Sequence, residues 1–191
     1  MRIGVLALQG AVAEHLHMLS ELGCEAVAVK KPSQLDGLAG LIIPGGESTT
    51  IGKLMAEYGF DQRIRTLAAQ GLAVYGTCAG LILLAKEIEG SAQPRLGLMD
   101  ITAHRNAFGR QVESFEVDLP VPVLGDPPLR AVFIRAPYIV RVGSGVEVLA
   151  RYGDKIVLAR QGRFLASAFH PELTEDTRLH AYFLRLAVGK V

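Results

Sequence analysis

Residues 72–86 read LAVYGTCAGLILLAK, and this stretch decides the fold class. The apolar run at 72–75 predicts a buried strand, and the apolar run after Gly80 predicts a helix. Between them the residues GTCAG predict a sharp turn that places Cys78 at the start of that helix. The two glycines supply the room and the backbone freedom that a strained strand-to-helix turn needs. A helix N-terminus favours a thiolate, so Cys78 is a candidate nucleophile.

The alternative for Cys78 is a buried, inert cysteine, which is the usual state of this residue type. Cys24, in the plain context ELGCEAV, fits that alternative. Two cysteines in unrelated contexts also argue against a disulfide framework and fit a reducing cytoplasm. The glycines on both sides of Cys78 favour the nucleophile at that position.

A nucleophilic cysteine needs a base, and the base needs a group that orients it. The segment RFLASAFHPELTED offers both, because a predicted strand at 163–169 ends at His170 and Glu172 follows two residues later. The alternative is a polar loop in which Glu172 belongs to the first turn of the last helix, and this segment alone favours the loop. Together with the turn at Cys78, the pattern favours a Cys78–His170–Glu172 triad.

A third segment, LAGLIIPGGESTTIGKL, places another apolar strand before the pair Gly45-Gly46. Backbone N–H groups at such a turn can stabilise an oxyanion. A helix is expected to follow, with Ser48 or Thr49 as its N-cap. The Walker phosphate pattern is absent, since the Gly-Lys pair at 52–53 is followed by leucine. An ordinary turn into a helix stays open as the alternative.

Alternating strands and helices predict an α/β fold, a three-layer sandwich with a mainly parallel central sheet and helices on both faces. The first half is predicted to hold strands at 2–8, 25–29, 40–43 and 72–76 and helices at 11–22, 49–57, 60–70 and 79–88. The second half is predicted to hold short strands at 97–103, 112–118, 130–135, 145–150, 155–160 and 163–169 and a last helix at 174–188. These later strands are expected to add antiparallel neighbours at one edge. No linker or repeat divides the chain, so a single domain over 1–191 is expected.

Ligands of open α/β sheets bind at the carboxyl ends of the strands. Gly46, Cys78 and His170 each follow the carboxyl end of a predicted strand. This convergence predicts acyl transfer at one edge of the sheet, and it leaves the substrate open.

The three segments together resemble the triad-type (class I) glutamine amidotransferases, and the resemblance covers essentially the whole chain. The motifs that carry it are GVLALQGAVAEH, PGGESTT, GTCAGLILLAKEI, RNAFGRQVESFE, VFIRAP and FHPELTED. Within that class, the stretches LQGAVAEH, RNAFGRQ and FIRAP make the chain similar to the glutaminase subunits of pyridoxal 5′-phosphate synthases. The resemblance implies hydrolysis of L-glutamine to glutamate and ammonia through a cysteinyl thioester. It also implies a partner, a synthase subunit that uses the ammonia to make pyridoxal 5′-phosphate (vitamin B6) in a large hetero-oligomer.

The same resemblance implies which residues hold the glutamine. Arg105 and Arg135 take positions of glutamine contacts, and a guanidinium suits a carboxylate because its donors form a planar fork. Glu47 is implied to meet the α-ammonium group. On the residues alone, each arginine is more readily a surface ion pair. The rest of the substrate pocket and the oxyanion hole are assigned to Gly46, Ser48, Ala79 and Ile134.

Composition narrows the class of protein further. No segment reaches ~18 uninterrupted apolar residues, so no membrane span is expected. No signal peptide is recognised, which together with the cysteines predicts a cytoplasmic protein. A net charge of +1 gives no electrostatic case for nucleic acid. No metal or organic cofactor is expected, since hydrolysis through a cysteinyl thioester needs none. His15 and His17 would lie about 200° apart on a helix and could not share one metal.

Two alternatives from other classes stay open. One is another cysteine hydrolase with the same turn, a peptidase or a glyoxalase-like protein, which would not need paired arginines for an amino acid. The other is a non-catalytic regulatory module of the same fold, against which an intact Cys-His-Glu set argues. The glycine pair at 45–46 also predicts a switch, because a glycine peptide can flip its N–H away from the oxyanion and a docked partner could favour the productive orientation.

Overall fold

Five short parallel strands form the centre of the protein, in a computed structural model that describes residues 1–106 and 114–191. Along the sheet their order is β2, β1, β3, β4 and β12. β3 and β4 are buried along their whole length, as expected for parallel strands covered on both faces. The five strands are Arg2–Leu6 (β1), Glu25–Val29 (β2), Gly40–Ile43 (β3), Ala73–Thr77 (β4) and Phe164–Ser167 (β12).

The C-terminal half extends this sheet with mostly antiparallel pairs. β12 pairs antiparallel with β11, β11 with β9, and β9 with β6, while the edge strand β5 runs parallel to β6. β10 pairs with β11 off this path, and β7 and β8 form a separate two-stranded sheet. The expected antiparallel additions at one edge are confirmed. These strands are Ala85–Ile88 (β5), Met99–His104 (β6), Ser114–Leu119 (β7), Leu129–Ile134 (β8), Tyr138–Val142 (β9), Glu147–Tyr152 (β10) and Lys155–Gln161 (β11).

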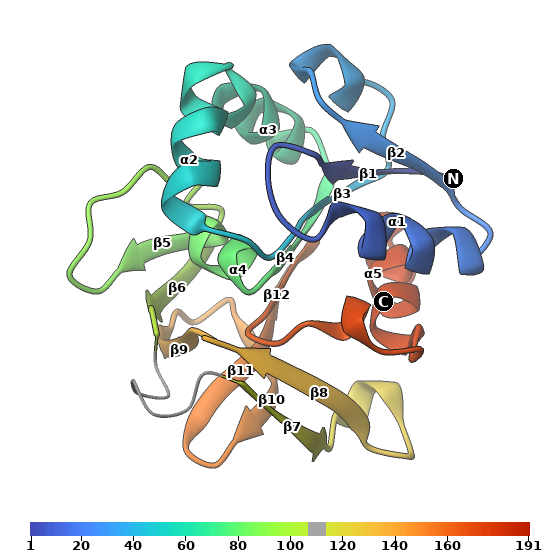
Figure 1. Cartoon of the computed structure of the whole chain (residues 1–191), viewed down its shortest axis with the longest axis vertical. Helices are drawn as coiled ribbons and strands as arrows, with labels where there is room; N and C mark the ends of the chain where they lie inside the picture. The colour runs from blue at the N-terminus through green and yellow to red at the C-terminus, as the bar shows by residue number, and fades with distance from the viewer. Residues whose placement is uncertain (107–113) are drawn as a thin grey trace.

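Helices cover both faces of the central strands, which confirms the three-layer prediction. Figure 1 shows α2, α3 and α4 on one side of these strands and α1 and α5 on the other. The helices are Val12–Glu21 (α1), Ser48–Glu57 (α2), Phe60–Ala69 (α3), Ala79–Leu84 (α4) and Arg178–Ala187 (α5). Three 3₁₀ turns complete the elements, at Pro32–Leu35 (η1), Pro122–Leu124 (η2) and Pro171–Leu173 (η3).

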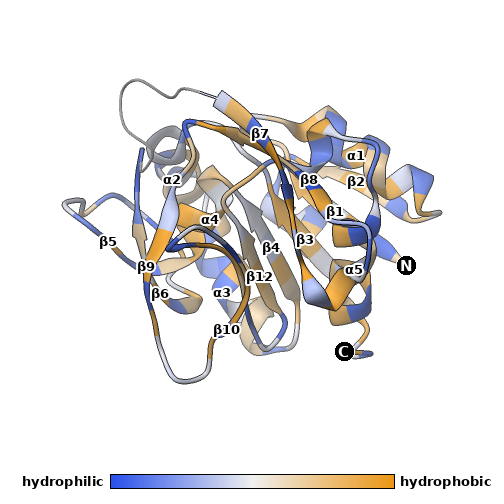
Figure 2. Cartoon of the chain, turned by 90° about the horizontal axis from the view of Figure 1, so that it is seen from below, coloured by the Kyte–Doolittle hydropathy of each residue, from blue (hydrophilic) through white to orange (hydrophobic). Residues whose placement is uncertain are grey.

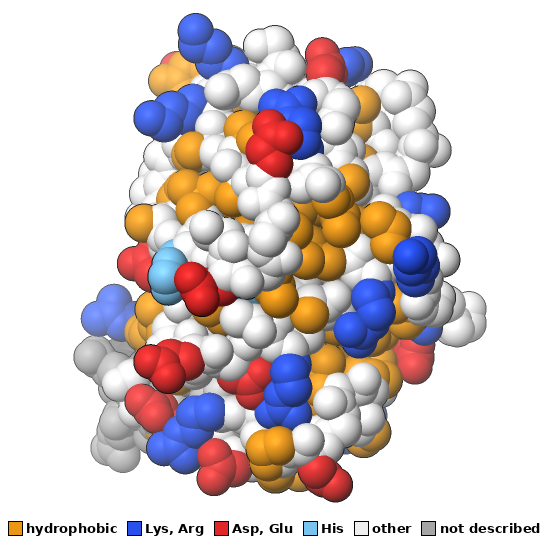
Figure 3. Space-filling view, turned by 90° about the vertical axis from the view of Figure 1, so that its right-hand side faces the viewer, with side chains coloured by type: hydrophobic (Ala, Val, Ile, Leu, Met, Phe, Trp, Pro, Cys, Tyr) orange, Lys and Arg blue, Asp and Glu red, His pale blue; other side chains and the backbone are white. Residues whose placement is uncertain are grey.

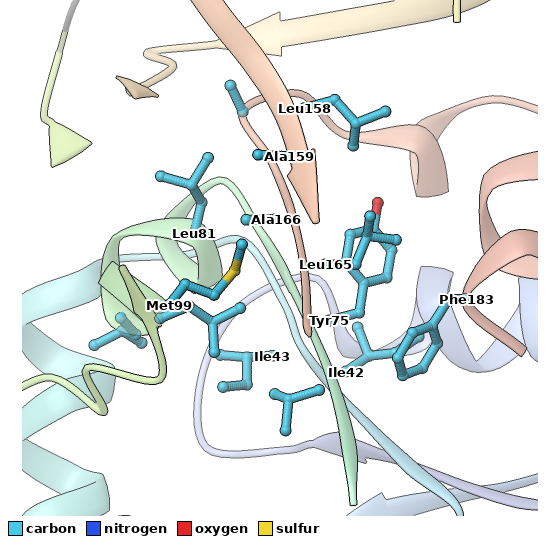
Figure 4. Close-up of a cluster of buried hydrophobic side chains, with 14 of the residues drawn as sticks. Ile42, Ile43, Tyr75, Leu81, Met99, Leu158, Ala159, Leu165, Ala166 and Phe183 are labelled. Atoms are coloured by element: carbon cyan, nitrogen blue, oxygen red, sulfur yellow. The ribbon is translucent and has the colours of Figure 1, made fainter. Parts of the chain in front are cut away.

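Alternating side chains of the central strands build a core on each face of the sheet. Ile42 points toward the layer that holds Tyr75 and Phe183, whereas its neighbour Ile43 points to the opposite layer, toward Leu81 (Figure 4). The rings of Tyr75 and Phe183 lie 5.5 Å apart and join β4 to α5. Apolar residues follow the same strands in Figure 2. The sheet is thereby fixed from both sides, which holds the carboxyl ends of its strands in place.

Three predicted elements were wrong or missing. The helix predicted at 79–88 ends at Leu84, because the chain becomes extended at Ala85 and pairs with β6 as β5. This tertiary pairing outweighs the helical preference of the local sequence. β9 at Tyr138–Val142 was not predicted. The last helix begins at Arg178 and not at 174, since residues 174–177 form a bend after η3 in which the Asp176 N–H donates to Oγ1 of Thr174. The first two residues of the strand predicted at 112–118 lie outside the described residues.

Candidate active site

The carboxyl ends of β3, β4 and β12 lie side by side, because these strands are parallel neighbours in the sheet. The Gly45-Gly46 pair follows β3, Cys78 follows β4 and His170 follows β12. All three segments line a cavity of about 570 Å³. The convergence expected from the sequence is therefore confirmed.

The turn at Cys78 is strained and tightly packed. Cys78 has φ 51° and ψ −101°, which is unusual for a residue with a side chain, and it directly precedes the first residue of α4. Its N–H donates to the Ser167 carbonyl at 2.8 Å, which ties the turn to β12. A Cβ on Gly80 would overlap the carbonyl oxygen of Ile43, and one on Gly76 would overlap the backbone of Gly80. The two glycines of the motif are therefore required by close backbone approach.

His170 is held from both sides. Its Nδ1 lies 2.7 Å from Oε1 of Glu172, and its backbone N–H donates to the Val132 carbonyl of β8 at 2.8 Å. Both side chains are buried. Because Glu172 takes Nδ1, the other ring nitrogen is left for Cys78, which lines the same cavity and helps to raise the pKa of His170. The three predicted triad residues thus lie together, with Glu172 bound to His170 and Cys78 beside it at the wall of the cavity.

The charge state of His170 follows from these neighbours. Burial lowers the pKa of His170, but the hydrogen bonds and charges of Cys78 and Glu172 outweigh burial and raise it to about 10. At neutral pH the imidazole therefore keeps its proton beside the sulfur. This is the arrangement that stabilises a thiolate and keeps a proton ready for a leaving group.

The glycine loop after β3 is anchored to the start of α1. The Gly45 carbonyl accepts a hydrogen bond from the Ala11 N–H at 3.0 Å, and the Glu47 N–H donates to Oε1 of Gln9 at 2.8 Å. A Cβ on Gly45 would overlap the ring of His170. The loop is thus packed against the base, and its observed orientation is held by the backbone of Ala11 and the side chain of Gln9. Gln9 lies in the stretch LQGAVAEH, but no sequence pattern indicated its role in holding this loop.

Glu47, and not Ser48 or Thr49, is the N-cap of α2, so that prediction was wrong. The Glu47 carboxylate accepts from the backbone N–H of Thr49 at 3.1 Å and of Thr50 at 2.8 Å. The hydrogen bond from the Thr50 hydroxyl is the main reason that the pKa of Glu47 is lowered. The Glu47 carboxylate thus takes the capping role that a serine, threonine, aspartate or asparagine side chain usually has at this position.

Arg105 and Ser48 are joined by Gln93, a residue that no sequence pattern singled out. Nη1 of Arg105 donates to Oε1 of Gln93 at 2.6 Å, and Nε2 of Gln93 donates to Oγ of Ser48 at 3.1 Å. Arg105 also contacts Oγ1 of Thr49 at 3.3 Å. Thr49 and Gln93 are neutral partners, so neither forms an ion pair with this guanidinium beside the cavity.

Ile134 ends β8, Arg135 follows it, and both line the cavity with Cys78. The Ile134 carbonyl lies 3.9 Å from Sγ of Cys78, and Arg135 has φ 43°. Of the ten predicted site residues, only Glu172 does not line the cavity, because it is buried behind His170. Gly45 of the predicted glycine pair also lines the cavity, as do five residues to which no role was assigned from the sequence: Gly10, Ala11, Ile82, Asn106 and Leu173.

Within residues 1–106 and 114–191, no group of three or more His, Cys, Asp and Glu side chains could hold a metal. His15 is buried and His17 is exposed, so the two histidines of α1 point to different environments. In the same part of the chain no helix is both long and apolar enough to span a membrane.

Comparison with known proteins agrees with this geometry. The model of the SNO glutamine amidotransferase family matches residues 5–189. The pyridoxal 5′-phosphate synthase subunit PdxT of Pelotomaculum thermopropionicum is 65% identical over 98% of this chain and 96% of its own. The PdxT subunit of Moorella thermoacetica is 61% identical over 97% of this chain and 99% of its own.

Solved structures show the same likeness. A crystal structure of a glutamine amidotransferase, 60% identical, superimposes with a TM-score of 0.94 over 97% of this chain and 98% of that one. PurLQS from Thermotoga maritima, 18% identical, has a TM-score of 0.73 over 96% and 97% of the two chains and shows that the fold is shared. The resemblance inferred from the motifs is confirmed, and the chain belongs to the SNO glutamine amidotransferase family.

Proposed function

We propose that this chain, as one glutaminase domain over residues 1–191, hydrolyses L-glutamine and supplies the ammonia to a synthase subunit that makes pyridoxal 5′-phosphate. The observation that carries the proposal is the buried His170 between Cys78 and Glu172, at the wall of a cavity that also holds two arginines. The relatives named as synthase subunits support the choice of substrate and partner.

The first half of the reaction forms a thioester. The Cys78 thiolate attacks the side-chain amide carbon of glutamine, a C–S bond forms, and the carbonyl electron pair moves to oxygen. The backbone N–H groups of Gly46 and Ala79 stabilise this oxyanion. His170 then gives its proton to the amide nitrogen, the C–N bond breaks and ammonia leaves. Glu172 keeps the imidazole oriented and stabilises its charge.

The second half releases glutamate. His170 takes a proton from water, and the water oxygen attacks the thioester carbon. The C–S bond breaks, the electron pair returns to sulfur and the thiolate of Cys78 is restored beside protonated His170. The γ-carboxylic acid of the product loses its proton to solvent. The enzyme thus returns to its starting charge state without a metal or an organic cofactor.

Charged side chains around the cavity suit a free amino acid. Arg105 and Arg135 offer guanidinium groups for the α-carboxylate, and the anionic Glu47 offers an acceptor for the α-ammonium. Glu47 can do this while it caps α2, because a carboxylate has about four acceptor sites. Ser48 and the backbones of Gly46 and Ile134 complete the pocket.

Ammonia released into water would be protonated and would diffuse away, so a partner that receives it directly is expected. We place its docking surface around the Gln9-Gly10 turn and α1, beside the cavity, in a large hetero-oligomer. The free cysteines are consistent with a reducing cytoplasm as the place of the reaction.

The experiment is ammonia release from glutamine, measured with and without the synthase subunit, with a peptide amide and a glyoxal as competing substrates. Release from glutamine alone supports the proposal. Turnover of the peptide or the glyoxal would instead favour another cysteine hydrolase. No turnover, and no labelling of Cys78 by a reactive glutamine analogue, would favour a regulatory module.

A further inference from the structure

A pair of buried histidines lies directly behind the triad and has no part in the mechanism above. His15 comes from α1 and His180 from α5, and both are completely buried. Nδ1 of His15 lies 2.9 Å from Nε2 of His180. Nε2 of His15 lies 3.1 Å from Oγ1 of Thr77 and 3.6 Å from Oε2 of Glu172. These are the polar groups that face His15, together with the more distant ring of His170.

The two carboxylate oxygens of Glu172 differ in their hydrogen bonds. Oε1 contacts His170, whereas Oε2 is buried and has no hydrogen-bond partner among the described residues. A buried charged oxygen without a donor is costly, and a nearby N–H reduces that cost. The distance of 3.6 Å from His15 exceeds that of an ordinary hydrogen bond, and a shift of about half an ångström would form one. His15 is therefore the donor that the second oxygen can reach.

The protons of the histidine pair can be assigned by counting donors. If His15 donated from Nδ1, its Nε2 lone pair would face the Glu172 carboxylate, and His180 would carry a buried Nδ1–H for which no acceptor is described. If His180 donates from Nε2, then His15 presents Nε2–H to Glu172 and Thr77, and Nδ1 of His180 is only an unpaired acceptor. The second arrangement is cheaper, because an orphaned buried N–H is the rarer and costlier defect.

Both histidines are neutral at physiological pH, which keeps this arrangement fixed. Burial, followed by the charges of His180 and His170, holds the pKa of His15 well below its ordinary value. Burial lowers the pKa of His180 to about 4. The pair therefore contributes an oriented N–H dipole and no positive charge of its own.

We infer that His15 is a positioning residue for glutamine hydrolysis: its Nε2–H holds the second oxygen of Glu172, and His180 keeps His15 in the donating tautomer. Holding both carboxylate oxygens fixes the rotation of Glu172 and so the direction of the His170 ring. The inference rests on the proposed function, since it concerns the same reaction. It adds α1 and α5 to the elements that align the base.

The test compares two amide replacements of His15 in the complex with the synthase subunit. In His15→Gln the amide nitrogen takes the place of Nε2 and still reaches Glu172, whereas in His15→Asn it takes the place of Nδ1 and does not. We expect His15→Asn to lower kcat by on the order of 10- to 100-fold with little change in KM, and His15→Gln to recover most of that loss. Gln62→Asn, on the exposed side of α3 and away from the docking surface proposed at α1, is the control and should behave as wild type.

A double-variant measurement separates positioning from general damage. If His15 acts through Glu172, His15→Asn should cause little further loss of kcat in a Glu172→Gln background. An equal loss in both backgrounds would overturn the inference, as would a wild-type kcat for His15→Asn. Urea unfolding midpoints of all variants show whether they are folded. Should His15→Asn not fold, His15→Gln decides alone, and a loss beyond about tenfold would contradict the inference.

The two proposals fail in different ways. If the wild-type complex releases no ammonia from glutamine, the proposed function itself is wrong. If the wild-type complex is active and both amide variants match it, only the role of His15 is wrong.

Discussion

At the scale of single residues, Cys78 and His170 show how the fold prepares a reactive pair. The left-handed backbone of Cys78 costs of order 1–3 kcal/mol and is held by the hydrogen bond to Ser167 and by the packing of Gly80. His170 is buried, yet its pKa is raised to about 10, because the hydrogen bonds and charges of Cys78 and Glu172 outweigh burial. The strain and the buried charge are therefore both located where the chemistry is proposed.

Glu172→Gln tests the orienting role of the carboxylate. The amide is similar in shape but lacks the charge that stabilises protonated His170, so kcat for glutamine should fall by roughly 10²- to 10⁴-fold. KM should change little, since Glu172 lies behind His170 and does not line the cavity. Steady-state glutaminase kinetics measure both constants. An unaltered kcat would mean that the His-Pro-Glu stretch is only a polar loop.

The pH dependence of activity tests the charge of His170. The pKa of His170 in the folded protein is about 10, above the ordinary 6.5. The imidazole proton, and with it the ion pair between His170 and Glu172, is therefore present at neutral pH and is lost as the pH rises through about 10. We expect kcat/KM to fall on the alkaline side near that pH. In Glu172→Gln the fall should move to lower pH, because the carboxylate that helps to raise the pKa is gone. An alkaline limb that is the same in both proteins would contradict this assignment.

At the scale of elements, the close packing of α4 against β3 depends on Gly80. Gly80→Ala would place a methyl group on the Ile43 carbonyl oxygen, so it should destabilise the protein by at least about 1–3 kcal/mol. Gly145→Ala is the matched control, since its new methyl group meets nothing closer than 3.5 Å, and the change should stay within about 0.5 kcal/mol. Urea unfolding measures both. Equal unfolding free energies for the two variants would show that the close approach is not needed.

The sequence predicted the elements that carry strong local signals. The G-x-C-x-G turn placed Cys78 between β4 and α4, and β3, β4 and β12 were predicted to within a residue or two at their carboxyl ends. Apolar runs bounded by glycine or proline give such boundaries directly. The convergence of their carboxyl ends was also predicted, because parallel strands in an α/β fold end at the same edge of the sheet.

The elements that were missed depend on contacts between distant segments. β5 is a strand only because β6 lies beside it, and local sequence favoured a continued helix there. Gln93 reaches the site from a loop that carries no motif. Glu47 caps α2 because the glycine loop after β3 places it directly before the helix. The histidine pair of α1 and α5 joins residues 165 positions apart. Sequence spacing cannot reveal contacts of this kind.

At the scale of the whole molecule, the active site is connected to an outer face of the protein through α1. The Ala11 N–H holds the Gly45 carbonyl, so the orientation of the 45–46 peptide depends on the start of α1. Figure 3 views the side of the molecule on which Figure 1 draws α1 and β2, and apolar side chains form a band there between charged ones. A band of this kind suits contact with another protein.

Partner docking should therefore control the activity. We expect the free chain to be a poor glutaminase and expect its kcat to rise as synthase subunit is added, because docking at α1 favours the peptide orientation in which the Gly46 N–H faces the oxyanion. Steady-state ammonia release, titrated with the synthase subunit, measures this effect. Full activity of the isolated chain, unchanged at saturating partner, would rule out the switch and the peptide flip.

The measurement that tests the central claim most directly is made on the complex with Cys78→Ala. The proposed thioester forms on Cys78, so the variant should release no glutamate above background and should make no pyridoxal 5′-phosphate from glutamine. Synthesis of pyridoxal 5′-phosphate from added ammonium should be unchanged, which shows that the partner is intact. Glutamate release by Cys78→Ala at the wild-type rate would contradict the assignment of Cys78 as the nucleophile.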